Sequence, residues 1–423
     1  LNLKQYDGQL ATPLFSSIRP LNQQARHQSN PLFNLSFSLL YSSHYFRMSA
    51  SQAPILTTVS QAEIPRFAFA FDIDGVLLHD SKPIPGAAET LKYLQSHNIP
   101  FILLTNGGGK LEHERVQILS DCLGVPLSLG NFIQAHTPFQ QLVHQSWTEG
   151  EQGLADKHIL VTGAEPEKSR LIAEAYGFRS VITPADILAA HPTIFPLPWE
   201  ANYKATARPL PSPETKISAI FVFNDPRDWY VDTQIIMDLL LSQDGVLGTY
   251  SPKNGRSEYE NNGWQVDGQP ELYFSHCDLF YSTTYPLPRF GQGSFQAALA
   301  GIWRQITDQR AELKRTTIGK PHARTYSYAE RVLAEWRASM LAEDGAAGKE
   351  VQPLDRVYMI GDNPESDIRG ANDYVSPCGT DWASILVRTG VWSQDRDGEP
   401  KYTPDIIVDD VKSAVEWAVE REG

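Results

Sequence analysis

The chain has 423 residues, of which 41% are hydrophobic and 20% are charged. This composition supports a substantial buried core and excludes a fibrous protein or a disordered tail. The formal net charge is −14, and because an acidic surface repels phosphate backbones, a nucleic-acid-binding role is disfavoured. No stretch approaches the roughly 18 consecutive apolar residues of a membrane span, so we expect no transmembrane segment.

Residues 1–60 differ in composition from the rest of the chain. They contain four basic side chains, one acid and ten serines, a charge balance of +3 that leaves −17 on the remaining 363 residues. A leader that is poor in acids, rich in serine and bears arginine is typical of a mitochondrial transit segment. We therefore expect a mitochondrial protein, with a cytoplasmic location as the alternative. The competing interpretation is an untranslated stretch or a wrongly assigned gene start, because the chain begins with Leu1 and Met48 precedes the first strand pattern.

From residue 61 onward, strand and helix patterns alternate. Apolar runs of strand length predict strands at 67–73, 99–104, 158–161, 217–223, 357–360 and 384–387. Helical spacing of apolar residues predicts helices at 85–97, 116–123, 167–176, 233–242 and 324–342, another that starts near Pro364, and a last one spanning 411–418. Nearly continuous apolar strands that alternate with helices predict an α/β fold, with a parallel sheet covered on both faces.

Polar and charged residues gather where these strands end. The segments are Asp72-Ile73-Asp74 after the first strand, Thr105-Asn106 with Gly107 to Gly109 after the second, Gly361-Asp362-Asn363 after a late strand, and Ile318-Gly319-Lys320-Pro321 before the long helix. Ligands bind at the carboxyl ends of parallel strands. Several carboxylates that converge there cannot all stay ionised without a cation. Mg²⁺ is the best fit if a phosphate shares its coordination shell.

The same residue types suit phosphoryl chemistry. Lys320 and the backbone N–H groups near Asp74 and the glycine run could hold phosphate oxygens. A carboxylate that faces phosphorus can act as a nucleophile. A second acid two residues along the chain could protonate the leaving oxygen and then deprotonate water.

Four of these segments carry a resemblance to a known family. Residues 71–76 (FDIDGV), 104–106 (LTN), Lys320-Pro321 and 361–367 (GDNPESD) resemble, in the right order, motifs I to IV of the haloacid dehalogenase superfamily. The long interval between the second and third motifs resembles class IIA, whose members carry a large α/β cap there. Residues 223–229 (FNDPRDW) and 285–291 (YPLPRFG) are similar to the mitochondrial subfamily named after the cat eye syndrome critical region, which has many fungal members.

This resemblance implies a fold, a domain order and an activity. The fold would be α/β, with a Rossmann-like core that contains a parallel sheet and an inserted α/β cap of the C2 type. We expect the first part of the core at 61–178, the cap at 179–305 and the second part of the core at 306–423. The implied activity is Mg²⁺-dependent hydrolysis of a phosphate monoester, a small phosphorylated metabolite, through a phospho-aspartate. The resemblance also leaves open a homodimer formed through the cap.

The resemblance assigns catalytic and phosphate-binding roles. Asp72 would be the nucleophile and a metal ligand. Asp74 would be the general acid and base, and would ligate the metal through its backbone carbonyl. Thr105 would bind the transferring phosphoryl group with help from the Asn106 amide, and Lys320 would neutralise the nucleophile and the phosphate.

The remaining implied roles concern the metal and the cap. Asp362 would ligate Mg²⁺, and Asp367 would support the site without contacting the metal. Arg227 and Arg289 are the candidates for substrate contacts from the cap. One departure from the family pattern is the run at 107–109, where many class IIA phosphatases have serine or threonine. Glycines keep the backbone donors but remove the hydroxyls, which puts substrate contacts there in doubt.

Two other classes of function remain as alternatives. The first is a catalytically idle descendant that serves as a binding or scaffold protein in mitochondria, tied to glycerophospholipid metabolism. The intact set of four motifs argues against it. The second is a nucleotide-cofactor oxidoreductase on a similar sheet. This alternative lacks support because Asp72-Ile73-Asp74-Gly75 stands where a Gly-x-Gly-x-x-Gly fingerprint belongs.

Overall fold

The computed structural model describes residues 64–423 except 149, 151, 196–200, 282, 284, 286 and 343–351. The leader expected at 1–60 therefore lies outside the described residues. Among the helices that the structure describes, none has both the length and the apolar character needed to cross a membrane.

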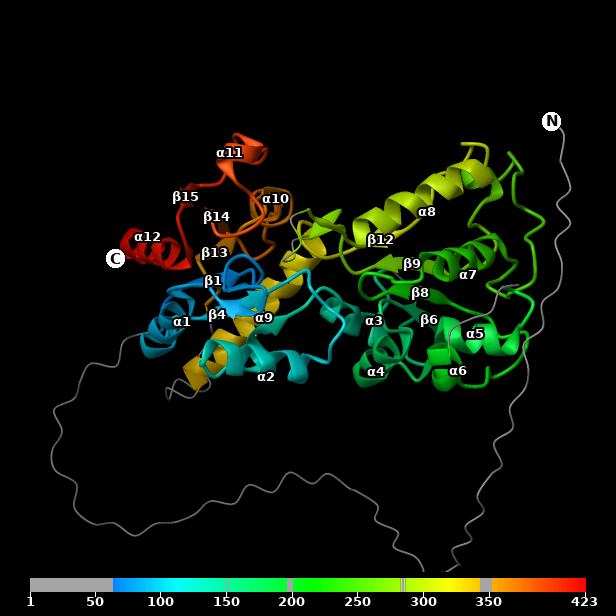
Figure 1. Ribbon diagram of the computed structural model, residues 1–423, viewed down its shortest axis with the longest axis horizontal. Coiled ribbons are helices and arrows are strands. Elements are labelled where there is room, and N and C mark those ends of the chain that lie inside the picture. The colour runs from blue at the N-terminus through cyan, green and yellow to red at the C-terminus, as the bar shows by residue number, and fades with distance from the viewer. Residues whose placement is uncertain are drawn as a thin grey trace, which may run out of the picture. The chain divides into compact units, whose positions relative to one another are not determined.

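One sheet has six parallel strands in the order β15-β14-β13-β1-β4-β5 (Figure 1). Its strands are β1 (Phe67–Phe71), β4 (Phe101–Leu104), β5 (Phe132–Ile133), β13 (Arg356–Gly361), β14 (Asp381–Val387) and β15 (Ile406–Val408). Strand β1 lies in the middle, where Phe69 is opposite both Tyr358 and Phe101. A central strand is covered on both faces, which is why Ala68 to Phe71 are all buried.

Alternating side chains of β1 build two separate hydrophobic layers. Phe69 and Phe71 pack with helices α1, α2 and α12 on one face, whereas Ala68 and Ala70 pack with α9 and α10 on the other. These helices are α1 (Ala87–Ser96), α2 (Glu112–Leu123), α9 (Ala323–Leu341), α10 (Arg369–Asp373) and α12 (Val411–Glu422). The small Ala side chains leave room for the long helix α9 and its buried residues, including Tyr326.

A second sheet has five parallel strands in the order β12-β9-β8-β6-β7 (Figure 1). Its strands are β6 (His158–Thr162), β7 (Ser180–Ile182), β8 (Ala219–Val222), β9 (Glu271–Phe274) and β12 (Thr316–Thr317). Helices α5 (Pro184–Ala190), α7 (Trp229–Leu241) and α8 (Gln292–Ile306) pack on one face, and α3 (Gln141–His144) and α4 (Pro166–Tyr176) on the other. We call the segment that builds this sheet the cap.

Shorter elements lie between these strands and helices along the chain. They are the hairpin of β2 (Leu78–His79) and β3 (Lys82–Pro83), the hairpin of β10 (Phe280–Tyr281) and β11 (Arg289–Phe290), the helices α6 (Ala201–Thr206) and α11 (Gln394–Asp397), the 3₁₀ segments at Leu129–Asn131, Thr137–Gln140 and Glu260–Gly263, and a π-helical turn at Pro364–Ile368. All six predicted strands and all six helices predicted by range overlap an observed element. Near Pro364, the predicted helix begins as the π-helical turn and continues as α10.

The predicted cap boundaries are corrected at both ends. Strand β6 pairs with β7 and β8, and β12 pairs with β9. The second sheet therefore runs from residue 158 to residue 317, beyond the expected limits of 179 and 305. The reason is that hydrophobic periodicity predicts a strand without predicting its pairing partner. The pattern at 158–161 looks the same whichever sheet the strand joins.

Candidate active site

Three neighbouring strands of the six-stranded sheet deliver polar residues to one edge. Asp72 follows β1, Thr105 follows β4, and Asp362 follows Gly361 at the end of β13. Because β13, β1 and β4 are adjacent and parallel, their carboxyl ends meet at the same edge. Lys320 reaches this edge from the segment between β12 and α9.

A buried lysine lies between two of the aspartates. The Lys320 Nζ atom is 2.7 Å from Asp72 Oδ1 and 2.7 Å from Asp367 Oδ1. Burial alone would lower the pKa of Lys320, but the carboxylates of Asp367 and Asp72 raise it above its ordinary value. The second oxygen of Asp367 accepts the Asn363 N–H at 3.0 Å. Asp367 is thus held on both sides, and Lys320 is an ammonium group at neutral pH.

Three carboxylates crowd the same small space. One carboxylate oxygen from each of Asp72, Asp362 and Asp367 lies within 4.8 Å of the others. Burial raises the pKa of Asp362 far above its ordinary range, and the charges of Asp72 and Asp367 raise it further. Burial also raises the pKa of Asp367, to about 6, against the opposing effect of Lys320. One ammonium group cannot balance three carboxylates, so this cluster requires a further cation to be fully ionised.

The oxygen atoms available at this cluster fit a magnesium ion. Asp362 Oδ2 accepts the Val391 N–H at 2.5 Å, which leaves the other oxygen as a ligand. Asp72 offers its second carboxylate oxygen. No described residue donates a hydrogen bond to the backbone carbonyl of Asp74. Carboxylate and carbonyl oxygens are the ligands that Mg²⁺ prefers, with water completing its shell.

Two glycines allow the chain to approach Asp362 closely. A Cβ atom at Gly390 would lie 1.9 Å from Asp362 Oδ2, and a Cβ atom at Gly75 would lie 2.4 Å from the same oxygen. Neither distance is compatible with a side chain. Both positions therefore require glycine if Asp362 is to keep its place beside Asp72.

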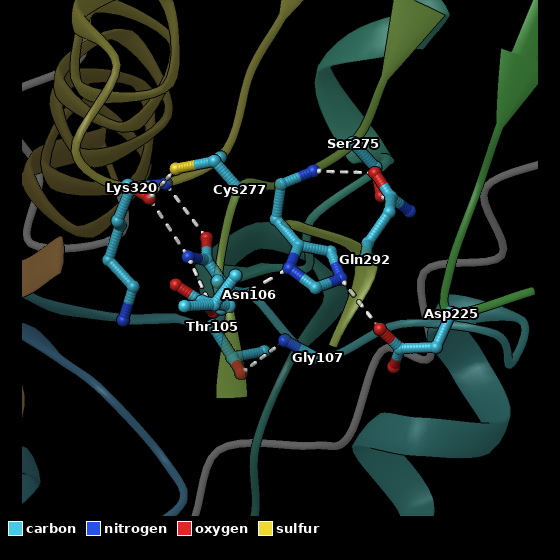
Figure 2. A network of polar contacts seen from close by, with 12 residues as sticks. Thr105, Asn106, Gly107, Asp225, Ser275, Cys277, Gln292 and Lys320 are labelled. Carbon is cyan, nitrogen blue, oxygen red and sulfur yellow. Dashed lines mark hydrogen bonds and ion pairs between the residues drawn. The ribbon is translucent and has the colours of Figure 1, made fainter. Parts of the chain in front are cut away.

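Thr105 and Asn106 have different surroundings although they are neighbours. The Thr105 hydroxyl oxygen accepts the Gly107 N–H at 2.9 Å, so its own proton can be donated to a ligand. The Asn106 side chain accepts the Lys320 N–H at 2.8 Å and donates to the Lys320 carbonyl at 2.9 Å (Figure 2). It also donates to Asp278 Oδ2 at 3.0 Å. The Asn106 side-chain amide is thus committed. Its backbone N–H, which bonds to no described residue, is the donor left for a phosphate.

Asp74 differs from Asp72 in exposure. The Asp74 side chain is 65% exposed, with Arg115 Nη2 at 4.0 Å, whereas the Asp72 side chain is 12% exposed. An exposed carboxylate can exchange protons with a ligand or with water. This difference suits the two roles that the resemblance implies for these residues.

These side chains line a cavity of about 490 Å³. The core contributes Asp72, Asp74, Thr105, Asn106, Lys320 and Asp362 among others, and the cap contributes Asp225, His276, Asp278, Phe280, Tyr281, Thr283 and Gly291. Neither Arg227 nor Arg289, the predicted cap candidates, is among the described residues that line it. Arg227 is exposed, and the Arg289 guanidinium lies 4.5 Å from the centre of the Tyr285 ring.

Sequence reasoning missed the charged group that the cap brings to the cavity. His276 Nε2 lies 3.5 Å from Asp225 Oδ1, and His276 Nδ1 lies 3.6 Å from Asp278 Oδ2. Burial would lower the pKa of His276, but Asp225 and Asp278 raise it to about 9. A signal was present: His276 and Asp278 follow the apolar run of β9, just as Asp72 follows β1. Because no strand is predicted from the sequence at β9, no site residue is predicted at that carboxyl end.

A second polar network lies behind the glycine run. The Gly109 N–H donates to His136 Nε2 at 3.2 Å, and His136 Nδ1 is 2.6 Å from the Tyr176 hydroxyl, which donates to Glu112. A Cβ atom at Gly108 would lie 2.9 Å from the His136 ring, and one at Gly109 would collide with Asn224. The glycines at 108 and 109 are therefore explained by packing, because side chains there would prevent the loop after β4 from approaching His136 and the cap residue Asn224.

The fold and the site define a class of enzyme, the haloacid dehalogenase-like hydrolases. Residues 69–179 match the family model with that description, and residues 317–414 match a second model of the same type, HAD-hydrolase-like. The chain is 36% identical over 376 residues to a mitochondrial hydrolase of Saccharomyces cerevisiae, covering 85% of this chain and 97% of that protein. The chain therefore belongs to the haloacid dehalogenase-like hydrolase family.

Two further comparisons bear on length and fold. The chain is 38% identical over 370 residues to a cardiolipin synthase (CMP-forming) / mitochondrial hydrolase fusion protein of Schizosaccharomyces pombe, covering 86% of this chain and 55% of that one. The chain thus spans about half the length of that relative. A p-nitrophenyl phosphatase from Archaeoglobus fulgidus has a similar structure, with a TM-score of 0.51 and 15% identity over 84% of this chain and 99% of that one. At this identity the similarity shows the fold alone.

Proposed function

We propose that this hydrolase cleaves phosphate monoesters through a phospho-aspartate at Asp72, with Mg²⁺ as its cofactor. The observation that carries the proposal is the placement of the Lys320 ammonium 2.7 Å from Asp72, inside a cluster that also contains Asp362. A buried carboxylate with a fixed cation beside it is suited to attack phosphorus. The phosphatase name of one structural neighbour is consistent with this chemistry.

The proposed reaction has two steps, phosphorylation of Asp72 and hydrolysis of the phospho-aspartate. In the first step, a carboxylate oxygen of Asp72 bonds to phosphorus while the bond to the leaving oxygen breaks, and Asp74 gives that oxygen a proton. In the second step, Asp74 takes a proton from water, whose oxygen displaces Asp72 from phosphorus. Lys320, the Thr105 hydroxyl and the Asn106 N–H hold the phosphoryl oxygens in both steps.

A bound Mg²⁺ would be held by Asp72, Asp362 and the Asp74 carbonyl, and would neutralise charge on the phosphoryl group. Asp367 contacts Lys320 instead, and supports the site by fixing the direction of the ammonium group. The contacts of Asp367 support this division, because one of its oxygens lies beside Lys320 and the other accepts the Asn363 N–H.

We further propose a small phosphorylated metabolite as the substrate. The cavity of about 490 Å³ has core residues on one side and cap residues on the other, which suits a ligand of metabolite size. The net charge of −14 disfavours nucleic acid as a substrate or partner. A homodimer through the cap remains a prediction, and light scattering on the purified chain would test it.

A mitochondrial location is proposed from the composition of residues 1–60 and from the names of the two yeast relatives. One of them is a fusion with a cardiolipin synthase, so we propose that phosphorylated metabolites of glycerophospholipid metabolism are tested first as substrates. Residues 1–60 fused to a fluorescent protein should bring it to mitochondria. A diffuse cytoplasmic signal from that fusion would contradict the location.

The activity is tested with the purified chain, Mg²⁺ and 4-nitrophenyl phosphate. We expect turnover that fluoroberyllate inhibits, and a phosphorylated protein after acid quench that Asp72→Asn does not form. Absence of both turnover and phosphorylation would contradict the proposal. That outcome would instead favour the idle binding or scaffold protein.

A further inference from the structure

The cap side of the cavity is anionic. Asp225 and Asp278 flank His276, so that two carboxylates face one imidazolium and the group carries a net charge of −1. Among the described cap residues that line the cavity, none is a lysine or an arginine. The cationic side chains Lys110, Arg115 and Lys320 all belong to the core.

The carboxylates keep free acceptor positions. His276 is 5% exposed, whereas the Asp225 and Asp278 side chains are 42% and 21% exposed. Asp278 Oδ2 already receives the Asn106 amide at 3.0 Å. Each carboxylate has room for about four hydrogen bonds, so the oxygens that face the cavity can accept more. Figure 2 shows Asp225 and Lys320 at opposite ends of this polar network.

His276 acts as the internal counter-charge of this group. Its Nδ1 atom is buried and has no hydrogen-bond partner in the described part of the chain, although Asp278 lies at 3.6 Å. The imidazolium therefore holds the two carboxylates near each other without saturating either one. Gly291 permits this arrangement, because a Cβ atom there would lie 2.5 Å from the Asp278 carbonyl oxygen.

We propose that Asp225, His276 and Asp278 select the leaving group of the substrate, favouring hydroxyl or ammonium donors and disfavouring a second anionic group. This inference rests on the proposed phosphatase function and specifies its substrate class. A polyol or amino-alcohol phosphate offers donors to the carboxylates. A carboxylate or second phosphate on the leaving group would instead lie near the negative carboxylates of Asp225 and Asp278. Repulsion between these like charges is strong because the cap side of the cavity is partly desolvated.

The test compares kcat/KM for matched small substrates on the full chain with Mg²⁺. Glycerol 3-phosphate and phosphoethanolamine represent the favoured class, and phosphoglycolate and 3-phosphoglycerate the disfavoured class. We expect the wild type to prefer the first class by about tenfold or more, the size of one hydrogen bond to a charged group. A preference for phosphoglycolate would overturn the inference while leaving the phosphatase function intact.

Two variants should move this preference in opposite directions. Asp225→Asn makes the cap side of the cavity less negative. It should reduce the ratio of kcat/KM for the favoured substrates to kcat/KM for the disfavoured substrates by about tenfold. His276→Gln makes the cap side of the cavity more negative and should lower kcat/KM for phosphoglycolate and 3-phosphoglycerate further, so that the ratio rises. Asp308→Asn, an exposed cap residue outside the cavity lining, is the matched control and should leave the ratio unchanged.

The remaining outcomes are also decisive. If both cavity variants keep the wild-type ratio and melting temperature, the group does not select the leaving group. If one variant fails to fold, the direction of the other still tests the inference. If 4-nitrophenyl phosphate gives neither turnover nor a phosphorylated protein with the wild type, the proposed function fails, and the inference fails with it.

Discussion

The Asn106 side chain and the Lys320 backbone exchange two hydrogen bonds, of 2.8 and 2.9 Å, across 214 residues of sequence. Each partner both donates and accepts, so the pair fixes the orientation of the Lys320 segment. The Lys320 ammonium then lies between Asp72 and Asp367. The Asn106 side chain thus aligns the lysine of the site, and its backbone N–H is left for a phosphate.

Asn106→Ala should weaken both stability and activity. It removes a buried pair of hydrogen bonds and leaves the Lys320 N–H and carbonyl unpaired, at a cost of about 2 kcal/mol in the free energy of unfolding. Denaturant titration measures that loss. We also expect kcat to fall more than KM rises, because the ammonium group loses its alignment. Unchanged stability and kcat would show that this pair does not position Lys320.

Asp72→Asn should abolish turnover while the fold is retained. The amide is nearly isosteric but is a poor nucleophile, and losing a nucleophile typically costs about 10⁴-fold or more in kcat. Lys320 keeps Asp367 as a partner, so we expect a melting temperature close to that of the wild type. Steady-state kinetics and thermal unfolding measure the two effects. Activity like that of the wild type would contradict the mechanism.

Asp74→Asn gives a contrasting result in the same assay. Its side chain is largely exposed, so the fold should be unaffected. Both proton transfers should slow, and a phosphorylated protein should be trapped if the second step slows more.

Magnesium should be needed for activity and should stabilise the protein. EDTA should remove turnover and Mg²⁺ should restore it. Because the ion would bind the folded state, Mg²⁺ should also raise the melting temperature of the wild type.

Asp362→Asn should abolish both effects of Mg²⁺. The variant removes a buried carboxylate whose pKa is raised by burial and by Asp72 and Asp367. Without metal, it should be at least as stable as the wild type, whereas the rise in melting temperature with Mg²⁺ should be lost. A variant that still gains stability and activity from Mg²⁺ would exclude Asp362 as a ligand.

Gly390→Ala should displace Asp362, although Gly390 has no side chain that could bind metal or substrate. The added Cβ atom would lie 1.9 Å from Asp362 Oδ2, so the chain or the carboxylate must move. We expect a weaker apparent affinity for Mg²⁺ and a kcat reduced by about 10²-fold, the effect of about 1 Å of misplacement.

Gly301→Ala is the matched control for Gly390→Ala. Gly301 lies in α8, and a Cβ atom there would meet nothing within 4 Å. Alanine is the better helix former by about 1 kcal/mol, so this variant should be slightly more stable and fully active. Equal kinetics for the two variants would contradict the close packing at Asp362.

Stability should fall as the pH is lowered toward 4, because His136 is buried as a neutral ring. Burial lowers the pKa of His136 from 6.5 to about 4. The unfolded chain therefore takes up a proton near pH 6.5 that the folded chain takes up only near pH 4. This contribution to the free energy of unfolding is fully present above pH 6.5. It is lost as the pH falls from 6.5 to about 4, and the loss is up to about 3 kcal/mol.

Denaturant titrations at pH 7 and pH 4.5 measure this effect. His136→Gln should lose less stability than the wild type between the two values, because it has no ring to protonate. Equal losses for the two proteins would mean that His136 does not remain neutral in the folded state.

The amino-acid sequence predicts which polar residues lie at the edge of the core sheet. Asp72, Thr105 and Asp362 each stand directly after an apolar run, and parallel strands place such residues at one edge. Apolar periodicity also located the main strands and helices, since burial of one face or both is a local property of the chain. Lys320 was found through its place in the order of motifs.

The sheet that each strand joins, and the residues that the cap brings to the site, depend on tertiary packing. Strand β6 resembles a core strand in sequence yet pairs in the cap, because pairing depends on partners distant in the chain. The contact between Asn106 and Asp278 joins residues 172 positions apart. Arg227 and Arg289 carry the charge expected of anion-binding residues but are not among the described residues lining the cavity. The less obvious His276 lines it, because side-chain direction is set by packing that periodicity does not encode.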